Sequence, residues 1–256
     1  MRLALRDLEI RFGDRRVVTI EELDLAGEEI LGLVGESGSG KSMTALAVLG
    51  LAEAAGASVG GSIRFDGLEL VGLSGPALRR VRGARIAMIF QNPVSAFNPV
   101  FRVGEIFLRT LRLHGLGRGD ALERARAGLR EVLLTPDLLE RYPHQLSGGQ
   151  AQRVAIALAV ALRSELLLAD EPTSALDVTV QAEILELLRG LRDRDGITIL
   201  MISHDLAVIG QLSDRVAVMR DGRIVESGRT ASVLRSPREP YTRELVAAVP
   251  RIGAAA

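Results

Sequence analysis

A glycine-rich stretch between a short apolar segment and a helix-forming segment constrains this chain more than any other feature. The apolar segment, residues 29–34, has the pattern of a buried strand, and a helical pattern covers residues 41–51. Between them stands Gly35-Glu36-Ser37-Gly38-Ser39-Gly40-Lys41-Ser42. Glycines allow successive backbone N–H groups to turn toward phosphate oxygens, and the N-terminus of the following helix adds the positive end of its dipole. The sequence therefore predicts a strand–loop–helix unit that binds a nucleotide through its phosphates.

Lys41 is the only lysine in the chain, although lysine and arginine together number 32. An ammonium is a compact point charge on a flexible stem, whereas a guanidinium is a wide planar fork. A tight backbone loop around a phosphate admits the ammonium far better, so the arginine-rich composition itself points to position 41. We expect Lys41 to reach the β- and γ-phosphates and the hydroxyl of Ser42 to bind Mg²⁺, with Met43 completing the loop.

Composition excludes several other classes of protein. The chain has no cysteine, so it contains no disulfide framework, thiolate zinc site or cysteine-held iron–sulfur cluster. Its longest uninterrupted apolar run, residues 154–162, is far shorter than the roughly 20 residues that span a bilayer. The 32 basic residues balance 32 acidic ones, so no excess of positive charge favours a nucleic acid as a partner. A cytoplasmic protein is expected.

The pattern along the chain predicts an α/β protein with an inserted helical block. Strand patterns dominate the first quarter, and strands alternate with helices from residue 165 onward, which is typical of a parallel sheet covered by helices. The helical block between them, about 70 residues, is too long for an ordinary connection. We therefore expect a single domain over 1–249. Its parts are a nucleotide-binding core at 1–91 and 163–230, a helical subdomain at 92–162 and a C-terminal helical segment at 231–249, followed by a tail at 250–256.

Two carboxylates end a strongly apolar strand pattern in the second half of the chain. Residues 166–169 lead directly into Asp170 and Glu171. An aspartate at the carboxyl end of a strand beside a phosphate loop suits the binding of Mg²⁺. The adjacent glutamate projects in a different direction and can polarise the water that attacks a phosphate.

A second candidate anion site begins another helix. Ser147, Gly148, Gly149 and Gln150 stand at the start of a helical pattern over 148–163. A serine with two glycines at a helix N-terminus again presents N–H groups to an anion. The chain thus contains two phosphate-binding elements that lie far apart in the sequence, and this duplication needs an explanation.

The string Leu146-Ser147-Gly148-Gly149-Gln150 resembles the signature of the ATP-binding cassette (ABC) ATPases, the motor subunits of ABC transporters. Other elements of that family are present in the same order. Gln91 matches the Q-loop glutamine, Ser174-Ala175-Leu176-Asp177 matches the D-loop, and His204 matches the switch histidine. Phe12 lies upstream of Gly35, where the family places an aromatic side chain that stacks on adenine.

This resemblance implies a P-loop NTPase (RecA-like) fold with a parallel-sheet core, an N-terminal antiparallel β subdomain and an inserted α-helical subdomain. It also implies hydrolysis of ATP with Mg²⁺ between two subunits arranged head to tail. Each ATP then lies between the phosphate loop of one subunit and the signature of the other, which explains the two anion sites. In this scheme Glu171, His204 and Lys41 are catalytic, and Ser42, Gln91 and Asp170 bind the metal ion. The other nucleotide contacts come from Phe12, residues 35–43, residues 147–150 and Asp177.

Three longer strings, at 89–99, 142–145 and 236–242, are similar to those of importers of dipeptides, oligopeptides and nickel. Residues 95–99 are more like the nickel importers and residues 240–242 more like the peptide importers, so the cargo stays open. The resemblance implies transmembrane permease subunits that bind through the Q-loop and the helical subdomain. It also implies a second ATPase subunit, either a homologous chain or a copy of this one, and an extracellular solute-binding protein as an indirect partner. The expected location is peripheral, on the cytoplasmic face of the cell membrane.

An ABC ATPase without a membrane partner, serving DNA repair or translation, is the alternative function. Repair types carry very long coiled-coil insertions and translation types usually carry two cassettes in one chain, and the sequence has neither feature. A plain P-loop kinase is a second alternative, which the signature string and His204 disfavour.

We predict that Lys41→Arg impairs ATP hydrolysis by roughly 100-fold although it keeps the charge, because the planar guanidinium does not fit a cradle shaped for an ammonium. Release of phosphate by the purified variant measures this effect, with Lys41→Ala as the full-loss reference. Arg79→Lys, on a helix face expected to meet solvent, is the control and should hydrolyse ATP normally. Near-normal turnover of Lys41→Arg would mean that the single lysine has no special role.

Overall fold

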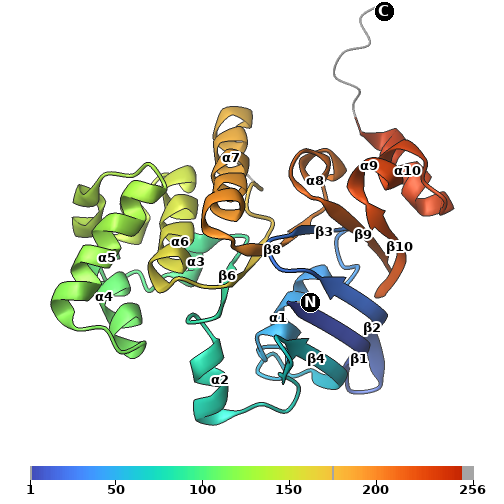
Figure 1. Cartoon of the computed structure of the whole chain (residues 1–256), viewed down its shortest axis with the longest axis horizontal. Helices are drawn as coiled ribbons and strands as arrows, with labels where there is room; N and C mark the ends of the chain where they lie inside the picture. Colours follow the sequence, from blue (N-terminus) through green and yellow to red (C-terminus); the bar gives the residue numbers. More distant parts are fainter. Residues whose placement is uncertain (1, 175, 250–256) are drawn as a thin grey trace, which may run out of the picture. The chain divides into compact units, whose positions relative to one another are not determined.

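The computed structural model describes residues 2–174 and 176–249 and divides into two compact units (Figure 1). The first unit contains the chain up to Leu73 and again from Thr198 onward, and the second unit contains Ser74–Ile197. Ala175 of the expected D-loop and the expected tail at 250–256 lie outside the described residues. The subdomain boundaries expected at residues 92 and 162 both fall inside the second unit and stay predictions.

The first unit begins with an antiparallel sheet in the order β2-β1-β4-β5. Its strands are β1 (Leu3–Phe12), β2 (Arg15–Leu25), β4 (Ser58–Phe65) and β5 (Leu68–Glu69). The pairing of β1 with β4 shifts register after Arg6, where Asp7 adopts a φ of 46°. Opposite this bulge a Cβ on Gly61 would lie 2.2 Å from the carbonyl oxygen of Asp7, so only glycine fits there. This sheet is the expected antiparallel β subdomain.

The same unit contains a second group of strands in the order β10-β9-β3-β8. They are β3 (Ile30–Val34), β8 (Thr198–Ser203), β9 (Arg215–Arg220) and β10 (Arg223–Arg229). β3 pairs in parallel with both β8 and β9, whereas β10 is antiparallel to β9. All residues of β3 and β8 are buried, as expected for parallel strands. The helices of this unit are α1 (Lys41–Val48), α8 (Leu206–Leu212), α9 (Thr230–Arg235) and α10 (Pro240–Ala248).

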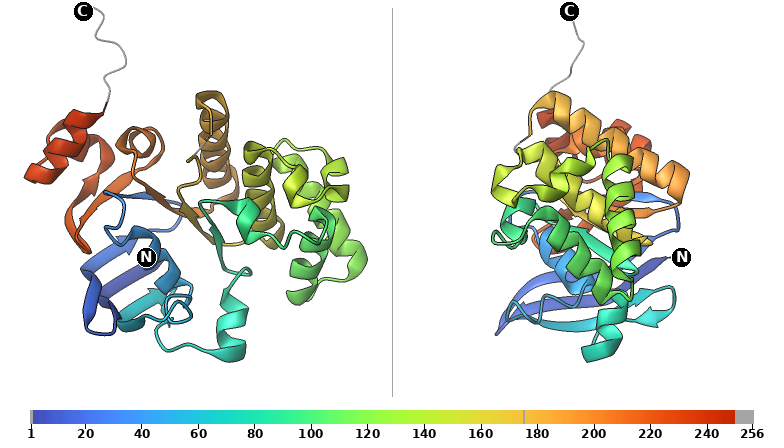
Figure 2. Two further views of the ribbon diagram at one scale, coloured as in Figure 1. Left: turned by 180° about the vertical axis from the view of Figure 1, so that it is seen from behind. Right: turned by 90° about the vertical axis from the view of Figure 1, so that its left-hand side faces the viewer.

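The second unit holds one parallel strand pair and most of the helices. β6 (Ile86–Ile89) pairs with β7 (Leu166–Asp170). The helices are α2 (Gly75–Val81), α3 (Pro93–Ala96), α4 (Val103–Leu113), α5 (Arg118–Glu131), α6 (Gly148–Leu162) and α7 (Val178–Asp195), with short 3₁₀ turns η1 (Pro136–Glu140) and η2 (Pro143–Gln145). The helices α4, α5 and α6 lie side by side (Figure 2). A Cβ on Gly128 of α5 would lie 2.8 Å from the carbonyl oxygen of Ala157 in α6, so the glycine permits this close approach.

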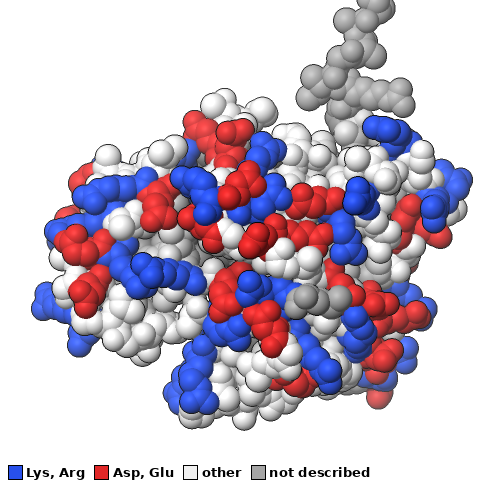
Figure 3. All heavy atoms as spheres, in the orientation of Figure 1, with Lys and Arg blue, Asp and Glu red and all other residues white. Residues whose placement is uncertain are grey.

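The strands and helices agree well with the sequence patterns, and the differences are local. The helix expected at 41–51 ends at Val48. β4 begins at Ser58, although Gly60 and Gly61 weaken the strand signal of its first half. Within the described part of the chain, none of the helices is long and apolar enough to cross a membrane. Figure 3 shows basic and acidic side chains interspersed over the visible face.

Candidate nucleotide-binding and hydrolysis site

The turn that joins β3 to α1 has a shape that depends on glycine. At Gly35 a Cβ would lie 2.0 Å from the carbonyl oxygen of Met219 in β9, so a larger residue would force the backbone apart. Gly38 and Gly40 have φ values of 82° and 105°, in the left-handed region that glycine adopts without strain. Gly40 is also the N-cap of α1 and provides no side-chain cap. The first N–H groups of α1 therefore meet no capping side chain, which is the arrangement that binds phosphate at helix N-termini.

The ammonium of Lys41 is folded back over this turn. The residue is only 5% exposed, and Nζ donates to the carbonyl oxygens of Gly35 and Glu36 at 2.7 Å each and to Oγ of Ser39 at 3.3 Å. An ammonium has three donors and no acceptor, so the loop carbonyls compensate the cost of its burial. The structure thus places the lysine inside the glycine-rich turn, where a phosphate can compete with carbonyl oxygens for its donors.

His204 and Phe12 occupy exposed positions in the same unit. Val34 of β3 pairs with Ser203 of β8, so the phosphate loop and His204 leave two neighbouring parallel strands at the same edge. The carboxyl edge of a parallel sheet is where α/β proteins bind ligands. The side chain of His204 is exposed there. Phe12 is the last residue of β1 and is 36% exposed, so its ring is accessible for stacking.

The second unit brings together the expected Q-loop glutamine and the two carboxylates. Ile89 of β6 pairs with Ala169 of β7, so Gln91 and Glu171 emerge at one edge. Nε2 of Gln91 donates to Oε2 of Glu171 at 2.9 Å. Asp170, the last residue of β7, is 7% exposed, whereas Glu171 turns away from the strand with a φ of 48°. Such a backbone conformation is uncommon for a residue other than glycine and aims the two adjacent carboxylates in different directions.

Ser147 is the N-cap of α6 and makes a reciprocal capping box with Gln150. Its Oγ accepts from the N–H of Gln150 at 3.2 Å, and its own N–H donates to Oε1 of Gln150 at 3.1 Å. A hydroxyl has one donor and two acceptor sites, so this cap leaves the O–H of the exposed Ser147 to donate elsewhere. The capping box therefore orients a hydroxyl donor at a positive helix end.

The glycines of the signature string also have a packing role that the sequence did not reveal. A Cβ on Gly149 would lie 2.7 Å from Cγ1 of Val180 in α7, and one on Gly148 would lie 3.5 Å from Cδ2 of Leu176. The start of α6 therefore packs closely against the start of α7. The signature and the expected D-loop are consequently neighbours in this unit.

Asp177 has a structural function in addition to the nucleotide contact expected for it. Its Oδ1 accepts from the N–H groups of Thr179 and Val180 at 3.1 and 3.0 Å, which makes it the N-cap of α7. A nucleotide contact by Asp177 stays a prediction. The neighbouring Val178, the first residue of α7, is 83% exposed.

The residues expected to bind Mg²⁺ have the donor chemistry of a nucleotide-bound magnesium site. Among the described residues no group of three or more His, Asp or Glu side chains could hold a metal ion by itself. Mg²⁺ in phosphate-transfer sites is usually held by one or two protein oxygens together with water and substrate phosphates, so a dedicated cage is not required. Ser42 in the first unit and Asp170 and Gln91 in the second supply oxygens of the kind that Mg²⁺ prefers.

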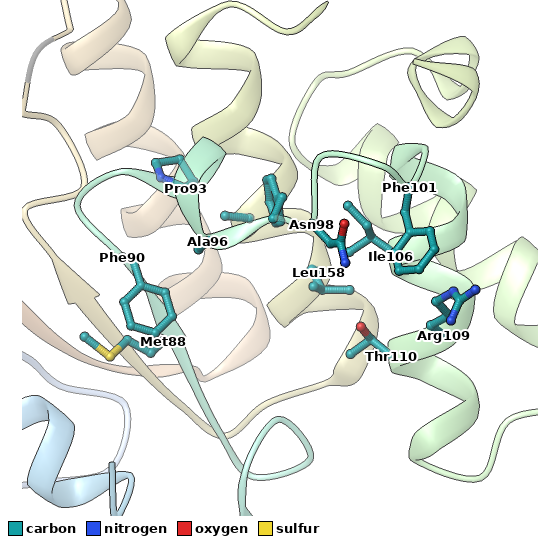
Figure 4. A pocket seen from close by; sticks show the side chains of 12 residues that line it. Met88, Phe90, Pro93, Ala96, Asn98, Phe101, Ile106, Arg109, Thr110 and Leu158 are labelled. Carbon is teal, nitrogen blue, oxygen red and sulfur yellow. The ribbon is translucent and has the colours of Figure 1, made fainter. Parts of the chain in front are cut away.

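An apolar groove of about 350 Å³ in the second unit was not found by sequence reasoning (Figure 4). It follows the expected Q-loop and is lined by Phe90, Phe101 and Ile106, with the guanidinium of Arg109 only 3.8 Å from the centroid of the Phe101 ring. Phe90 is 38% exposed. The feature of the sequence that could have indicated this groove is a concentration of aromatic residues, since four of the six phenylalanines lie between residues 90 and 107.

Comparisons with known proteins agree with this geometry. A family model described as ABC transporter matches residues 20–174. The chain is 41% identical over 255 residues to a dipeptide transport ATP-binding protein of Haemophilus influenzae, covering 97% of this chain and 77% of that protein. It is 43% identical over 265 residues to a glutathione import ATP-binding protein of Shigella dysenteriae, covering 98% of this chain but 42% of that protein.

Two solved structures are similar over most of their length. One is the cbiO1 protein of Clostridium perfringens, described as part of an ABC transporter complex, with a TM-score of 0.80 and 26% identity over 91% of this chain and 90% of that one. The other is the dimeric ATP-binding cassette MJ0796 in a post-hydrolysis state bound to ADP and Pi. Its TM-score is 0.79 and its identity 27%, covering 89% of this chain and 98% of that one.

The glycine-rich loop between a parallel strand and a helix, in an α/β fold shared with these cassettes, defines a P-loop NTPase, which confirms the predicted fold class. The chain belongs to the ABC transporter family, and its relatives confirm the resemblance to the importer branch.

We predict that Asp177→Ala destabilises the protein by about 1 kcal/mol, because α7 loses its N-cap, whereas Asp177→Asn leaves stability nearly unchanged because the amide oxygen can still accept the same two N–H groups. Denaturant unfolding followed by circular dichroism measures both. If Asn destabilised as much as Ala, the carboxylate charge rather than capping would be the stabilising feature. With stability kept as expected, ATP hydrolysis by Asp177→Asn reports on the nucleotide contact of Asp177 without interference from misfolding.

Proposed function

We propose that this chain is the ATP-binding and ATP-hydrolysing subunit of an ABC importer that takes up small peptides or nickel. The observation that carries the proposal is the presence of two phosphate-binding helix N-termini in one chain, at Gly40 of α1 and at Ser147 of α6. One bound nucleotide needs only one phosphate loop. The second element therefore serves the nucleotide held by another subunit. The dipeptide and glutathione relatives support a peptide as cargo, and nickel is the alternative within the same branch.

The phosphate loop binds ATP through backbone N–H groups and the ammonium of Lys41. On binding, Lys41 keeps its donor on Gly35 and turns the other two from Glu36 and Ser39 to the β- and γ-phosphates, which are stronger acceptors because they are fully charged. The ring of Phe12 stacks on adenine. Bound Mg²⁺, held by Ser42, Gln91 and Asp170, would neutralise charge on the phosphates.

Hydrolysis depends on a water molecule aimed at the γ-phosphorus. The carboxylate of Glu171 orients this water and accepts its proton, while the water oxygen bonds to phosphorus and the bond to the β,γ-bridging oxygen breaks. The hydrogen bond from Gln91 to Glu171 couples the Q-loop to this base. The exposed imidazole of His204 donates a hydrogen bond to the γ-phosphate, where negative charge builds up.

The working assembly is a head-to-tail pair of ATPase subunits with two nucleotides between them. The hydroxyl of Ser147, the N–H groups of Gly148 and Gly149, and Gln150 face the γ-phosphate held by the other subunit, and Asp177 contributes from the D-loop. ATP holds the pair together and hydrolysis releases it, because the γ-phosphate supplies the shared contacts. The second subunit is a homologous chain or a copy of this one, and the dimeric cassette structure supports such pairing.

Transmembrane permease subunits dock on the groove that follows the Q-loop. A partly exposed phenylalanine beside a concave apolar surface is typical of a protein-binding site, and Arg109 adds a charged rim. Because Phe90, which lines the groove, directly precedes Gln91, a partner bound in the groove would sense the state of the Q-loop. The subunit then lies on the cytoplasmic face of the membrane, and an extracellular binding protein delivers cargo to the permease. A soluble ABC ATPase of DNA repair or translation is not favoured by the import relatives.

Glu171→Gln should slow hydrolysis by about 100-fold or more while ATP still binds, because the amide keeps the shape of the side chain but cannot accept a proton. The trapped nucleotide should then stabilise the subunit pair, visible in size-exclusion chromatography as a dimer that forms with ATP and not with ADP. Ser147→Arg in the same background should abolish that dimer without weakening the affinity of the monomer for ATP. Loss of ATP affinity in the Ser147→Arg monomer would mean that both phosphate elements serve one nucleotide, contrary to the head-to-tail arrangement.

Ile106→Glu should abolish uptake while the purified variant hydrolyses ATP normally, because a carboxylate in the apolar groove opposes docking of the permease. Uptake of radiolabelled dipeptide and of nickel by a deletion strain carrying each variant is the measurement. Leu113→Glu is the matched control, since Leu113 belongs to the same helix but is 85% exposed. Unimpaired uptake of both cargoes in the deletion strain, combined with sensitivity to DNA damage, would favour the repair alternative.

A further inference from the structure

The C-terminal string at 236–242 contains no residue of the proposed hydrolysis site, yet one of its side chains reaches the phosphate loop. Tyr241, in the first turn of α10, is only 5% exposed. Its hydroxyl accepts a hydrogen bond from the backbone N–H of Glu36 at 3.1 Å, across 205 residues of sequence. Burial raises the pKa of the Tyr241 phenol, although the Glu36 N–H opposes this shift, so the hydroxyl stays neutral at physiological pH.

The peptide group between Gly35 and Glu36 is held from both ends. Its carbonyl oxygen, on Gly35, accepts from Nζ of Lys41 at 2.7 Å. Its N–H, on Glu36, donates to the hydroxyl of Tyr241. Hydrogen bonds at the two ends of one peptide group polarise each other, and each fixes the plane that the other uses. The position of the lysine ammonium is thus linked to the tyrosine hydroxyl through a single peptide group.

The end of β9 supports both sides of this arrangement. Met219 carries the carbonyl oxygen against which Gly35 packs, and the next residue, Arg220, places its guanidinium 4.7 Å from the centroid of the Tyr241 ring. The ring is therefore held by packing and by the cation above it. Its hydroxyl is the part that reaches the loop.

The start of α10 is fastened to β10 by one carboxylate. The side chain of Glu226 accepts from the N–H groups of Arg238 and Glu239 at 2.9 and 3.1 Å. These residues directly precede α10, so the bonds set where Tyr241 enters the fold. The tyrosine hydroxyl is consequently delivered to the loop at a fixed position instead of by a freely moving tail.

We propose that Tyr241 is a positioning residue of the phosphate loop: its hydroxyl holds the peptide group between Gly35 and Glu36 so that Lys41 is presented to the phosphates of ATP. The inference rests on the proposed role of Lys41 in binding those phosphates. Its effect falls on nucleotide affinity and not on the chemical step, because Tyr241 touches the loop and not the attacking water. Removal of one hydrogen bond of this kind corresponds to an affinity loss of about 3- to 10-fold.

Tyr241→Phe in the full chain tests the proposal, because it removes the hydroxyl and keeps the ring beneath Arg220. Calorimetric titration should give a Kd for MgADP about 3- to 10-fold higher than in the wild type. The rate of ATP hydrolysis should show the same increase in KM for ATP, with kcat within about twofold. Tyr142→Phe removes the only other tyrosine hydroxyl of the chain, in the second unit, and should leave the Kd unchanged. Amide hydrogen exchange at Glu36 should become faster in Tyr241→Phe and not in Tyr142→Phe. A general loss of stability would instead speed exchange at many amides.

A cycle with Lys41→Ala separates this inference from the function on which it rests. In the Lys41→Ala background the factor contributed by Tyr241→Phe should fall close to one, since the tyrosine acts through the lysine. The positioning role would be wrong if Tyr241→Phe left the Kd unchanged, or if it raised the Kd by the same factor with and without Lys41. A strong effect of Lys41→Ala would still support the proposed function in either case. If Lys41→Ala itself bound MgADP and MgATP like the wild type, the proposed role of Lys41 would fail and the inference with it.

Discussion

The close approach of Gly35 to the carbonyl oxygen of Met219 is the contact on which the nucleotide site depends. A Cβ at this position would lie 2.0 Å from that oxygen, so the loop can rest on β9 only if residue 35 is glycine. In the same loop the carbonyl oxygens of Gly35 and Glu36 each accept from Nζ of Lys41 at 2.7 Å. A charged group that is only 5% exposed is tolerated because these oxygens replace its water. The expected phosphate loop is therefore built from backbone, and the ammonium of Lys41 lies where a phosphate can compete for its donors.

Parallel pairing carries the other functional groups to the edges of the strands. Val34 pairs with Ser203 in the first unit, and Ile89 pairs with Ala169 in the second. Each register places two chemically active segments side by side: the phosphate loop with His204, and Gln91 with Glu171. Since all strands of such a pair run in one direction, every connection at the carboxyl edge can contribute a residue to the same region. Each unit thus gathers two of the expected site segments at one edge of its own parallel strands.

Two residues that cap helix N-termini are also expected to contact a nucleotide. Ser147 and Asp177 cap α6 and α7 with side-chain oxygens, and both belong to strings that are expected to contact a nucleotide. Capping fixes the rotamer of each side chain, so the same hydrogen bonds that stabilise the helix orient the functional group. α1 differs because Gly40 provides no side-chain cap, and its first turn is suited to a phosphate in place of a cap. This contrast distinguishes the helix that binds a subunit's own nucleotide from those proposed to contact a partner's nucleotide.

The sequence by itself determined the fold class, the alternation of strands and helices from residue 165 onward, and the strings around Lys41, Ser147 and Glu171, because these follow from local periodicity and from glycine at fixed spacings. It could not place Glu36 against Tyr241, which are 205 residues apart, or Gln91 against Glu171, which are 80 apart. It also missed the groove at Phe101 and the packing of Gly149 on Val180. Only the tertiary structure decided these pairs, because whether two distant side chains meet depends on strand register and on the close approach of neighbouring elements, and neither leaves a pattern in adjacent residues.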